Sequence, residues 1–166
     1  MSADTQASVT TQVYEIYIKA SPQAIWDAIT SPEWTTKYAY QGRVEYDLRT
    51  GGAYRAHATP DMRTMGLPDV VIDGEVIEAN PPTRLVQTYR FLFSDEMKAE
   101  GFTRITWEIE KASANFTRLT VTHELGGAPI MAGMVAGKFS EMGGGGWTWI
   151  LSDLKSLLET GTTLGG

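Results

Sequence analysis

Histidine is the side chain best suited to proton transfer near neutral pH, and this chain has two, His57 and His123. His123 lies in an alternating segment on the same side as the apolar residues Leu119 and Val121, so we expect its ring to face the interior. There it could be a hydrogen-bonded core histidine, or a polar anchor or general base for a bound molecule. His57 lies in a segment whose inward face the alternation leaves open.

Other groups that could perform catalysis are few. The chain has no cysteine, which excludes disulfides, thiolate catalysis and cysteine-bound metals. It also has no serine-hydrolase elbow, zinc-protease motif or phosphate-binding glycine motif. We therefore expect no metal and no cofactor and assign no catalytic residue, although His123 would be the acid or base if the protein were an enzyme. Three arginines are expected on the solvated face of the strands, or against an anionic ligand if they point inward: Arg55, Arg90 and Arg104.

The end of the chain predicts the element that would position these groups. Residues 143–161 read GGGGWTWILSDLKSLLETG, which is typical of a glycine hinge followed by an amphipathic helix that stops at Gly161. Trp147 lies in the apolar stripe of this helix, together with Ile150, Leu151 and Leu154. Trp149 points almost the opposite way, so we expect a loop, the first strand or a second copy of the chain to cover it. We favour a homodimer through a surface that includes Trp149.

The rest of the chain predicts mainly strands joined by short turns. Period-two alternation indicates strands at residues 13–19, 43–49, 53–59, 70–79, 84–93, 103–110 and 117–125. The Ser-Pro pairs at 21–22 and 31–32 predict two short helices after the first strand. The inward faces of 53–59 and 70–79 remain open. Residues 126–142 are rich in glycine and methionine, which suits either a flap over a cavity or a gap-filling structural segment, helical from Pro129.

Composition limits the partners. The chain has 166 residues, a net charge of -6 and a pI near 4.9, a balance that disfavours nucleic acid and anionic membrane surfaces as partners. No apolar run is long enough to cross a bilayer, and the first residues are unlike a secretory signal. We expect a cytoplasmic protein with a disordered tail at 1–12, a single domain at 13–161 and a short tail at 162–166.

Five segments carry a resemblance to a known family: YIKASPQAIWDAITSPE, GGAYR, GEVIEANPPTRLVQTYR, RLTVTHE and GGGGWTWILSDLKSLLETG. In order and spacing the chain resembles the START-like or SRPBCC superfamily, and within it the branch named for the activator of heat-shock-protein-90 ATPase. The resemblance implies an α+β helix-grip fold of the START/Bet v 1 type. In this fold a curved antiparallel sheet of six to seven strands surrounds a long C-terminal helix, with two short helices after the first strand. It also implies a cavity for sterols, lipids, polyketides, plant hormones or other apolar molecules.

We therefore predict binding of a small, largely apolar ligand between the sheet and the last helix. One alternative is an enzyme of the cyclase, hydrolase or isomerase type, in which His123 acts on a cavity-bound substrate. Another is a co-chaperone-like or stress-response module that works through protein contacts. The predicted ligand-binding residues are Trp34, Tyr38, Tyr46, Tyr89, Phe91, Trp107, His123, Met131, Met134, Trp147, Ile150, Leu151 and Leu154.

Overall fold

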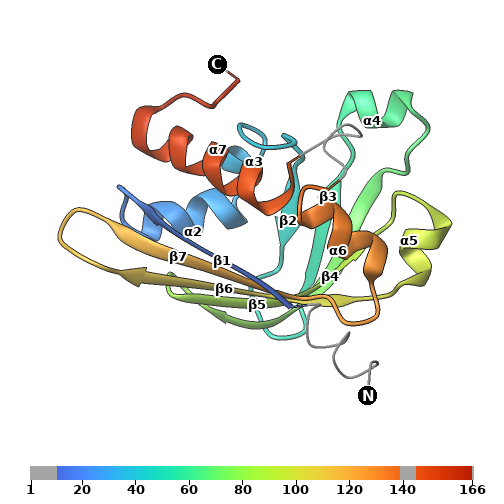
Figure 1. Ribbon diagram of the computed structural model, residues 1–166, viewed down its shortest axis with the longest axis horizontal. Coiled ribbons are helices and arrows are strands. Elements are labelled where there is room, and N and C mark those ends of the chain that lie inside the picture. Colours follow the sequence, from blue (N-terminus) through green and yellow to red (C-terminus); the bar gives the residue numbers. More distant parts are fainter. Residues whose placement is uncertain (1–10, 139–144, 166) are drawn as a thin grey trace.

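The computed structural model describes residues 11–138 and 145–165, which form one antiparallel sheet with helices on one side (Figure 1). The sheet order is β1-β7-β6-β5-β4-β3-β2, so that β1 and β2 are the edges. The strands are β1 (Thr11–Ile18), β2 (Val44–Tyr46), β3 (Ala53–His57), β4 (Val70–Asn80), β5 (Arg84–Phe91), β6 (Thr103–Lys111) and β7 (Thr117–Glu124). The predicted α+β helix-grip fold is confirmed, including the seven-stranded sheet and the two short helices after the first strand.

The helices begin where their capping residues predict. Helix α2 starts after Ser21, whose hydroxyl accepts a hydrogen bond from the Ala24 amide, and α7 ends at Gly161 in the left-handed conformation. The helices are α2 (Pro22–Thr30), α3 (Pro32–Thr35), α4 (Pro60–Thr64), α5 (Asp95–Ala99), α6 (Pro129–Val135) and α7 (Gly146–Thr160). Two of them, α4 and α5, lie where the sequence predicted loops; each is a single short turn of helix that begins at a capping Thr59 or Ser94.

Helices α2, α6 and α7 lie on the concave side of the sheet, where the core forms (Figure 1). The core cluster joins the apolar stripe of α7 to the inward faces of the central strands and to α2. Ile25, Leu119 and Leu154, from α2, β7 and α7, are each at most 1% exposed. Burying each such side chain contributes about 1.5–3 kcal/mol of transfer free energy. The packing of α7 on the sheet therefore places the residues discussed below.

A buried carboxylate fixes α7 against two irregular segments. Asp153 is 3% exposed and accepts hydrogen bonds from the Ala39 amide (2.8 Å) and from the Leu164 amide (2.7 Å). Ala39 itself has a φ of 53°, a conformation that non-glycine residues rarely adopt. The side chain thus secures both the loop after α3 and the residues that follow α7.

The start of α7 packs tightly against the end of α6. Gly146 has a φ of 67°, and a Cβ built on it would lie 2.2 Å from the Val135 carbonyl oxygen. Only glycine fits this combination of backbone conformation and close approach. Packing therefore requires glycine at this position, the first of α7. Residues 139–142 of the predicted flap and residues 143–144 of the predicted glycine hinge lie outside the described residues.

The strand boundaries differ from the prediction mainly at the sheet edges. Strand β1 starts at Thr11, two residues before the predicted start, and its Thr11 and Gln12 pair with β7. Strands β3 and β4 show register shifts at Ala56/His57 and Val76/Glu78. Such bulges place two residues opposite one, and they explain why alternation did not reveal the inward faces of these two segments.

Candidate functional site

His123 lies completely buried on β7 and bonds to partners from two other elements. The Trp147 indole Nε1–H of α7 donates to His123 Nδ1 at 3.0 Å. Because Nδ1 accepts, the neutral ring carries its proton on Nε2, which donates to Thr103 Oγ1 at 2.8 Å. Thr103 in turn donates to the Tyr89 carbonyl oxygen at 2.8 Å. Every polar atom of this chain of groups has a partner.

The surroundings of His123 keep the ring neutral. Burial lowers the pKa of His123 from 6.5 to about 3, because the imidazolium would lose its hydration. Trp147 and Tyr89 pack edge-on against the ring, and its hydrogen-bond partners Thr103 and Trp147 are neutral. With both ring nitrogens occupied, His123 has no free lone pair for a general base. The geometry favours the hydrogen-bonded core histidine of the two roles considered from the sequence.

A second buried polar group, Gln87 on β5, was not identified from the sequence. Its Oε1 accepts from the Tyr46 hydroxyl at 2.6 Å and from the Trp107 indole at 3.0 Å. An indole N–H can only donate, so the oxygen of the amide must face Trp107. The other end, Nε2, is fully buried and has no hydrogen-bond partner among the described residues. The signal for Gln87 was its place between Leu85 and Tyr89 on the inward face of β5, where a polar residue is unexpected.

A row of aromatic rings crosses the concave face beside Gln87. Successive ring centroids lie 4.6 Å apart for Tyr46 and Tyr54, 6.0 Å for Tyr54 and Tyr89, 5.6 Å for Tyr89 and Phe91, and 5.1 Å for Phe91 and Phe93. We call these five side chains the aromatic row. Burial raises the pKa of the three tyrosines, so their hydroxyls are neutral at physiological pH.

The predicted ligand-binding residues fall into two groups. One group belongs to the packed core, with each residue at most 8% exposed: Tyr38, Phe91, Trp107, His123, Met131, Trp147, Leu151 and Leu154. The other group is partly exposed while packing against that core: Trp34, Tyr46, Tyr89, Met134 and Ile150. Tyr46 and Tyr89, of the second group, belong to the aromatic row. Tyr54, which was not among the predicted ligand-binding residues, lies between Tyr46 and Tyr89 in the row.

Helix α6 is held in place by residues far from it in the sequence. The Glu100 carboxylate accepts from the amides of Ile130 (2.7 Å) and Met131 (3.1 Å), which are otherwise unpaired at a helix start. Gln12 of β1 donates to the Ala132 carbonyl oxygen at 3.0 Å. From the sequence, residues 126–142 could be a flap over a cavity or a structural segment. The contacts of the described part are those of a structural segment.

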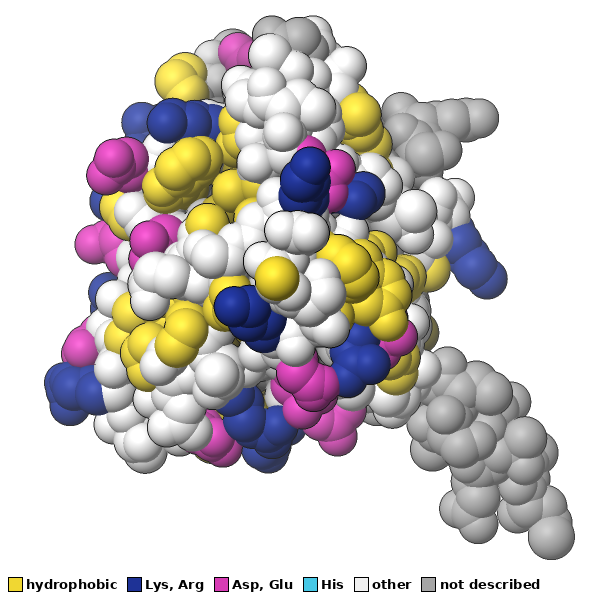
Figure 2. All heavy atoms as spheres, turned by 90° about the vertical axis from the view of Figure 1, so that its left-hand side faces the viewer, with side chains coloured by type: hydrophobic (Ala, Val, Ile, Leu, Met, Phe, Trp, Pro, Cys, Tyr) yellow, Lys and Arg dark blue, Asp and Glu magenta, His cyan; other side chains and the backbone are white. Residues whose placement is uncertain are grey.

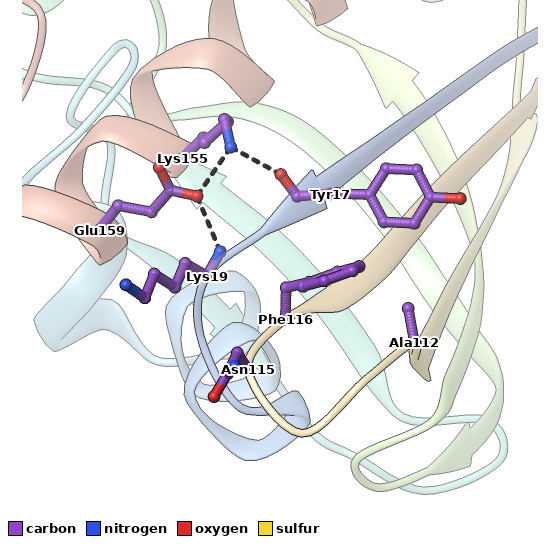
Figure 3. A pocket seen from close by; sticks show the side chains of 7 residues that line it. All are labelled: Tyr17, Lys19, Ala112, Asn115, Phe116, Lys155 and Glu159. Atoms are coloured by element: carbon purple, nitrogen blue, oxygen red, sulfur yellow. Dashed lines mark hydrogen bonds and ion pairs between the residues drawn. The ribbon is translucent and has the colours of Figure 1, made fainter.

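Two open hollows lie on the surface, and neither is lined by a residue predicted to bind ligand. The first, of about 750 Å³, lies where the end of β1 meets α7 and the β6–β7 turn (Figure 3). There Lys155 Nζ donates to the Tyr17 carbonyl oxygen and to Glu159, each at 2.7 Å, and Glu159 also accepts from the Lys19 amide. These groups satisfy one another and secure β1 to α7. The second hollow, of about 430 Å³, lies beside the start of β5.

Figure 2 shows the face of the molecule that lies at the left in Figure 1. On this face acidic and basic side chains are interspersed with small hydrophobic patches, and neither charge dominates. Arg90 forms two hydrogen bonds with Asp73 (2.9 and 2.7 Å). Arg104 pairs loosely with Glu124 at 3.8 Å, and Arg55 is exposed. The arginines therefore have partners or solvent, as the prediction of a solvated face required.

Trp149 is covered by a loop of the same chain. The Tyr40 ring packs against it with centroids 5.3 Å apart, which leaves the indole only partly exposed. The predicted dimer through Trp149 stays a prediction, and Tyr40 would belong to the same surface.

Within the described part of the chain, no three His, Asp or Glu side chains lie close enough to hold a metal ion. Across residues 11–138 and 145–165, none of the helices has the length and apolar character needed to cross a membrane.

Comparison with known proteins places the chain in a family. The family described as "Activator of Hsp90 ATPase homolog 1-like protein" matches residues 19–159. The chain belongs to this family. The match covers every element from α2 onward, and the resemblance inferred from the five segments is confirmed. No curated protein matches the chain.

Several solved structures share the fold at low sequence identity. The Aha1 dimer from Colwellia psychrerythraea has a TM-score of 0.62 and 20% identity, over 91% of this chain and 97% of that one. PFC0360w, an HSP90 activator from Plasmodium falciparum, has a TM-score of 0.54 and 22% identity, over 93% and 91%. DynU16, from the dynemicin biosynthetic locus, has a TM-score of 0.63 and 22% identity over 93% of this chain. This chain spans only about half of DynU16, 49% of its length.

Proposed function

We propose that the protein binds a small, largely apolar and uncharged molecule on the concave face, at the aromatic row. The observation that carries the proposal is the row itself, in which Tyr46 and Tyr89 are partly exposed although they pack against the core. Binding sites for small molecules combine such aromatic surface with a few polar groups. Here the polar groups are neutral tyrosine hydroxyls and the Gln87 amide.

The contacts of His123 argue against the enzyme alternative in the form considered from the sequence. To act as an acid or base, His123 would first have to break its hydrogen bond with Trp147 or with Thr103. We therefore favour a binding protein over a cyclase, hydrolase or isomerase that depends on His123.

The proposal can be tested with a neutral fluorescent probe, N-phenyl-1-naphthylamine. We expect saturable binding of one probe molecule per chain, measured by fluorescence titration and counted by native mass spectrometry. Tyr89→Leu should weaken binding about 3–10-fold, because an aromatic contact is worth about 0.5–1.5 kcal/mol beyond its area.

The matched control is Tyr17→Leu, which changes an exposed tyrosine of β1 beside the surface hollow. This control should bind the probe as the wild type does. Absence of saturable binding, or equal weakening by both variants with their circular dichroism unchanged, would contradict the proposal.

A second candidate is a protein-binding module, which the names of the family and of the Plasmodium relative suggest. One observation favours it: Tyr17 and Phe116 form an exposed aromatic pair, 47% and 40% exposed, with centroids 5.7 Å apart. Under this hypothesis Tyr17→Leu would reduce stimulation of an Hsp90 ATPase, and Tyr89→Leu would leave it unchanged. The two variants thus separate the two functions.

A further inference from the structure

The first strand, β1, has a free edge that α7 covers only at one end. The strand lies at the edge of the sheet and pairs with β7 on its other side (Figure 1). Near the end of the strand, Lys155 Nζ of α7 donates to the Tyr17 carbonyl oxygen at 2.7 Å. Glu159 of α7 accepts from the Lys19 amide at 2.7 Å. These two contacts show that the backbone groups of the odd-numbered residues face the free edge.

The backbone of residues 11–15 faces the same edge without such cover. The N–H and C=O groups of successive residues point to opposite sides of a strand. Thr11, Val13 and Glu15 therefore direct theirs to the free edge, as Tyr17 does. Within the described part of the chain, no other group bonds to the edge-facing N–H and C=O groups of Val13 and Glu15. This part of the edge is free to pair with another strand.

Among the described residues, 11–15 show none of the devices that usually protect a sheet edge. Edge strands are commonly shortened, bulged, or given lysine or proline. Here the eight residues of β1 pair with β7 without a register shift, and 11–15 contain no lysine or proline. The one charged side chain, Glu15, turns toward β7, where it lies 3.9 Å from Arg118 and accepts from Thr120 at 3.4 Å. Val13, in the middle of the segment, is 62% exposed.

We propose that β1 pairs in antiparallel orientation with β1 of a second copy of this chain, so that the two sheets become one. A two-fold axis at Val13 sets this residue opposite its own copy and sets Thr11 opposite Glu15. In this register the edge-facing N–H and C=O groups of residues 11–15 bond to one another across the axis. The two exposed Val13 side chains pack together, and each Glu15 carboxylate lies beside a neutral threonine.

Other registers of the same pairing fit less well. An axis at Glu15 would oppose two carboxylates, which is destabilising. It would also set Val13 opposite Tyr17, whose carbonyl oxygen already bonds to α7. An axis at Tyr14 would set Thr11 opposite Tyr17 and meet the same obstacle. A second copy is favoured as the occupant because one symmetric register satisfies both the charges and the free backbone groups.

The first measurement is the molecular mass in solution, by sedimentation equilibrium at chain concentrations from about 1 μM to about 1 mM. One chain has a mass of 18.2 kDa, and we expect twice that value at the higher concentrations. Val13→Lys should raise the dissociation constant about tenfold or more, because two like charges would meet at the axis. The matched control is Met65→Lys, which adds the same charge at a 72% exposed residue directly after α4. This control should dimerise as the wild type does.

A second measurement reports the register and does not depend on whether Val13→Lys folds. The chain has no cysteine, so a single introduced thiol can form a disulfide only with its own copy. In the proposed register the two Cα atoms at Val13 lie about 5.5 Å apart, within the range of a disulfide. Those at Thr11 lie more than about 10 Å apart, because each is four residues out of register with its copy. Oxidation should therefore link Val13→Cys into a covalent dimer and leave Thr11→Cys unlinked.

Three results would overturn the inference. The wild type could keep the mass of one chain at every concentration. Val13→Lys could dimerise as tightly as Met65→Lys, which would assign the contact to another surface, such as the one that includes Trp149. Thr11→Cys could form the disulfide as readily as Val13→Cys, which would exclude the proposed register. A dimer that Val13→Lys weakens and Val13→Cys links would support it.

Discussion

Acid should destabilise this protein through one buried residue, His123. In the unfolded chain its ring takes up a proton near the ordinary pKa of about 6.5, whereas in the folded protein its pKa is about 3. Between these values the unfolded state binds the additional proton, so protonation favours unfolding. The contribution is present above about pH 6.5 and is lost as the pH falls toward 3.

The magnitude follows from the two pKa values. Linkage gives a loss of about 2 kcal/mol in the free energy of unfolding between about pH 7.5 and about pH 5. That is a large share of the roughly 5–15 kcal/mol that stabilises a typical domain. Solvent does not screen this contribution, because the ring is 0% exposed and its hydrogen-bond partners Thr103 and Trp147 are neutral.

The assay is urea unfolding followed by circular dichroism at several pH values in this range. His123→Gln is the informative variant, because its amide can accept from Trp147 and donate to Thr103 without titrating. We expect the variant to lose the pH dependence that the wild type shows. His57→Gln is the control, since it removes the other histidine, and it should retain the dependence.

Two results would refute this reasoning. The free energy of unfolding of the wild type could stay constant between about pH 7.5 and about pH 5, which would mean that the folded state also accepts the proton. Alternatively, His123→Gln could keep the same dependence as the wild type, which would assign it to other groups.

Two further predictions concern α7. Asp153→Asn should lower the free energy of unfolding in urea by about 1–3 kcal/mol, because the NH2 group of asparagine would face one of the two backbone N–H groups that now donate to the carboxylate. The exposed control Asp95→Asn should lower it by less than about 0.5 kcal/mol. Equal losses in the two variants would contradict the role given to Asp153. Gly146→Ala should prevent folding or lower the melting temperature far more than Gly161→Ala. Both positions have positive φ, but only the Cβ added at Gly146 would lie 2.2 Å from a carbonyl oxygen. Similar melting temperatures for the two variants would show that the close approach of α6 and α7 does not require glycine.

The fold could be predicted because several patterns were unambiguous. Strands β6 and β7 alternate cleanly, and Leu119, Val121 and His123 of β7 are buried as predicted. Helix α7 carries its apolar stripe and its glycine stop in the sequence. Strands β3 and β4 could not be assigned, because bulges at Ala56/His57 and Val76/Glu78 shift the period.

The site was only partly predictable, because alternation gives the face of a side chain and not its depth. Trp107 and Tyr89 face the same way, yet one belongs to the buried core and the other is partly exposed. The partners of His123 come from β6 and α7, so only tertiary packing reveals that its ring nitrogens are occupied. Gln87 was overlooked since its significance lies in an unpaired atom rather than in its residue type.

The position of β1 at the sheet edge beside β7 has a consequence for how the chain folds. Thr11 pairs with Glu124, more than a hundred residues later, and Lys155 of α7 bonds to the Tyr17 carbonyl oxygen at the other end of β1. During synthesis the first strand therefore has to wait unpaired until β7 has been made. Contacts so distant in sequence slow folding because the intervening chain must be ordered before they form, so we expect completion of the sheet to be a late step of folding.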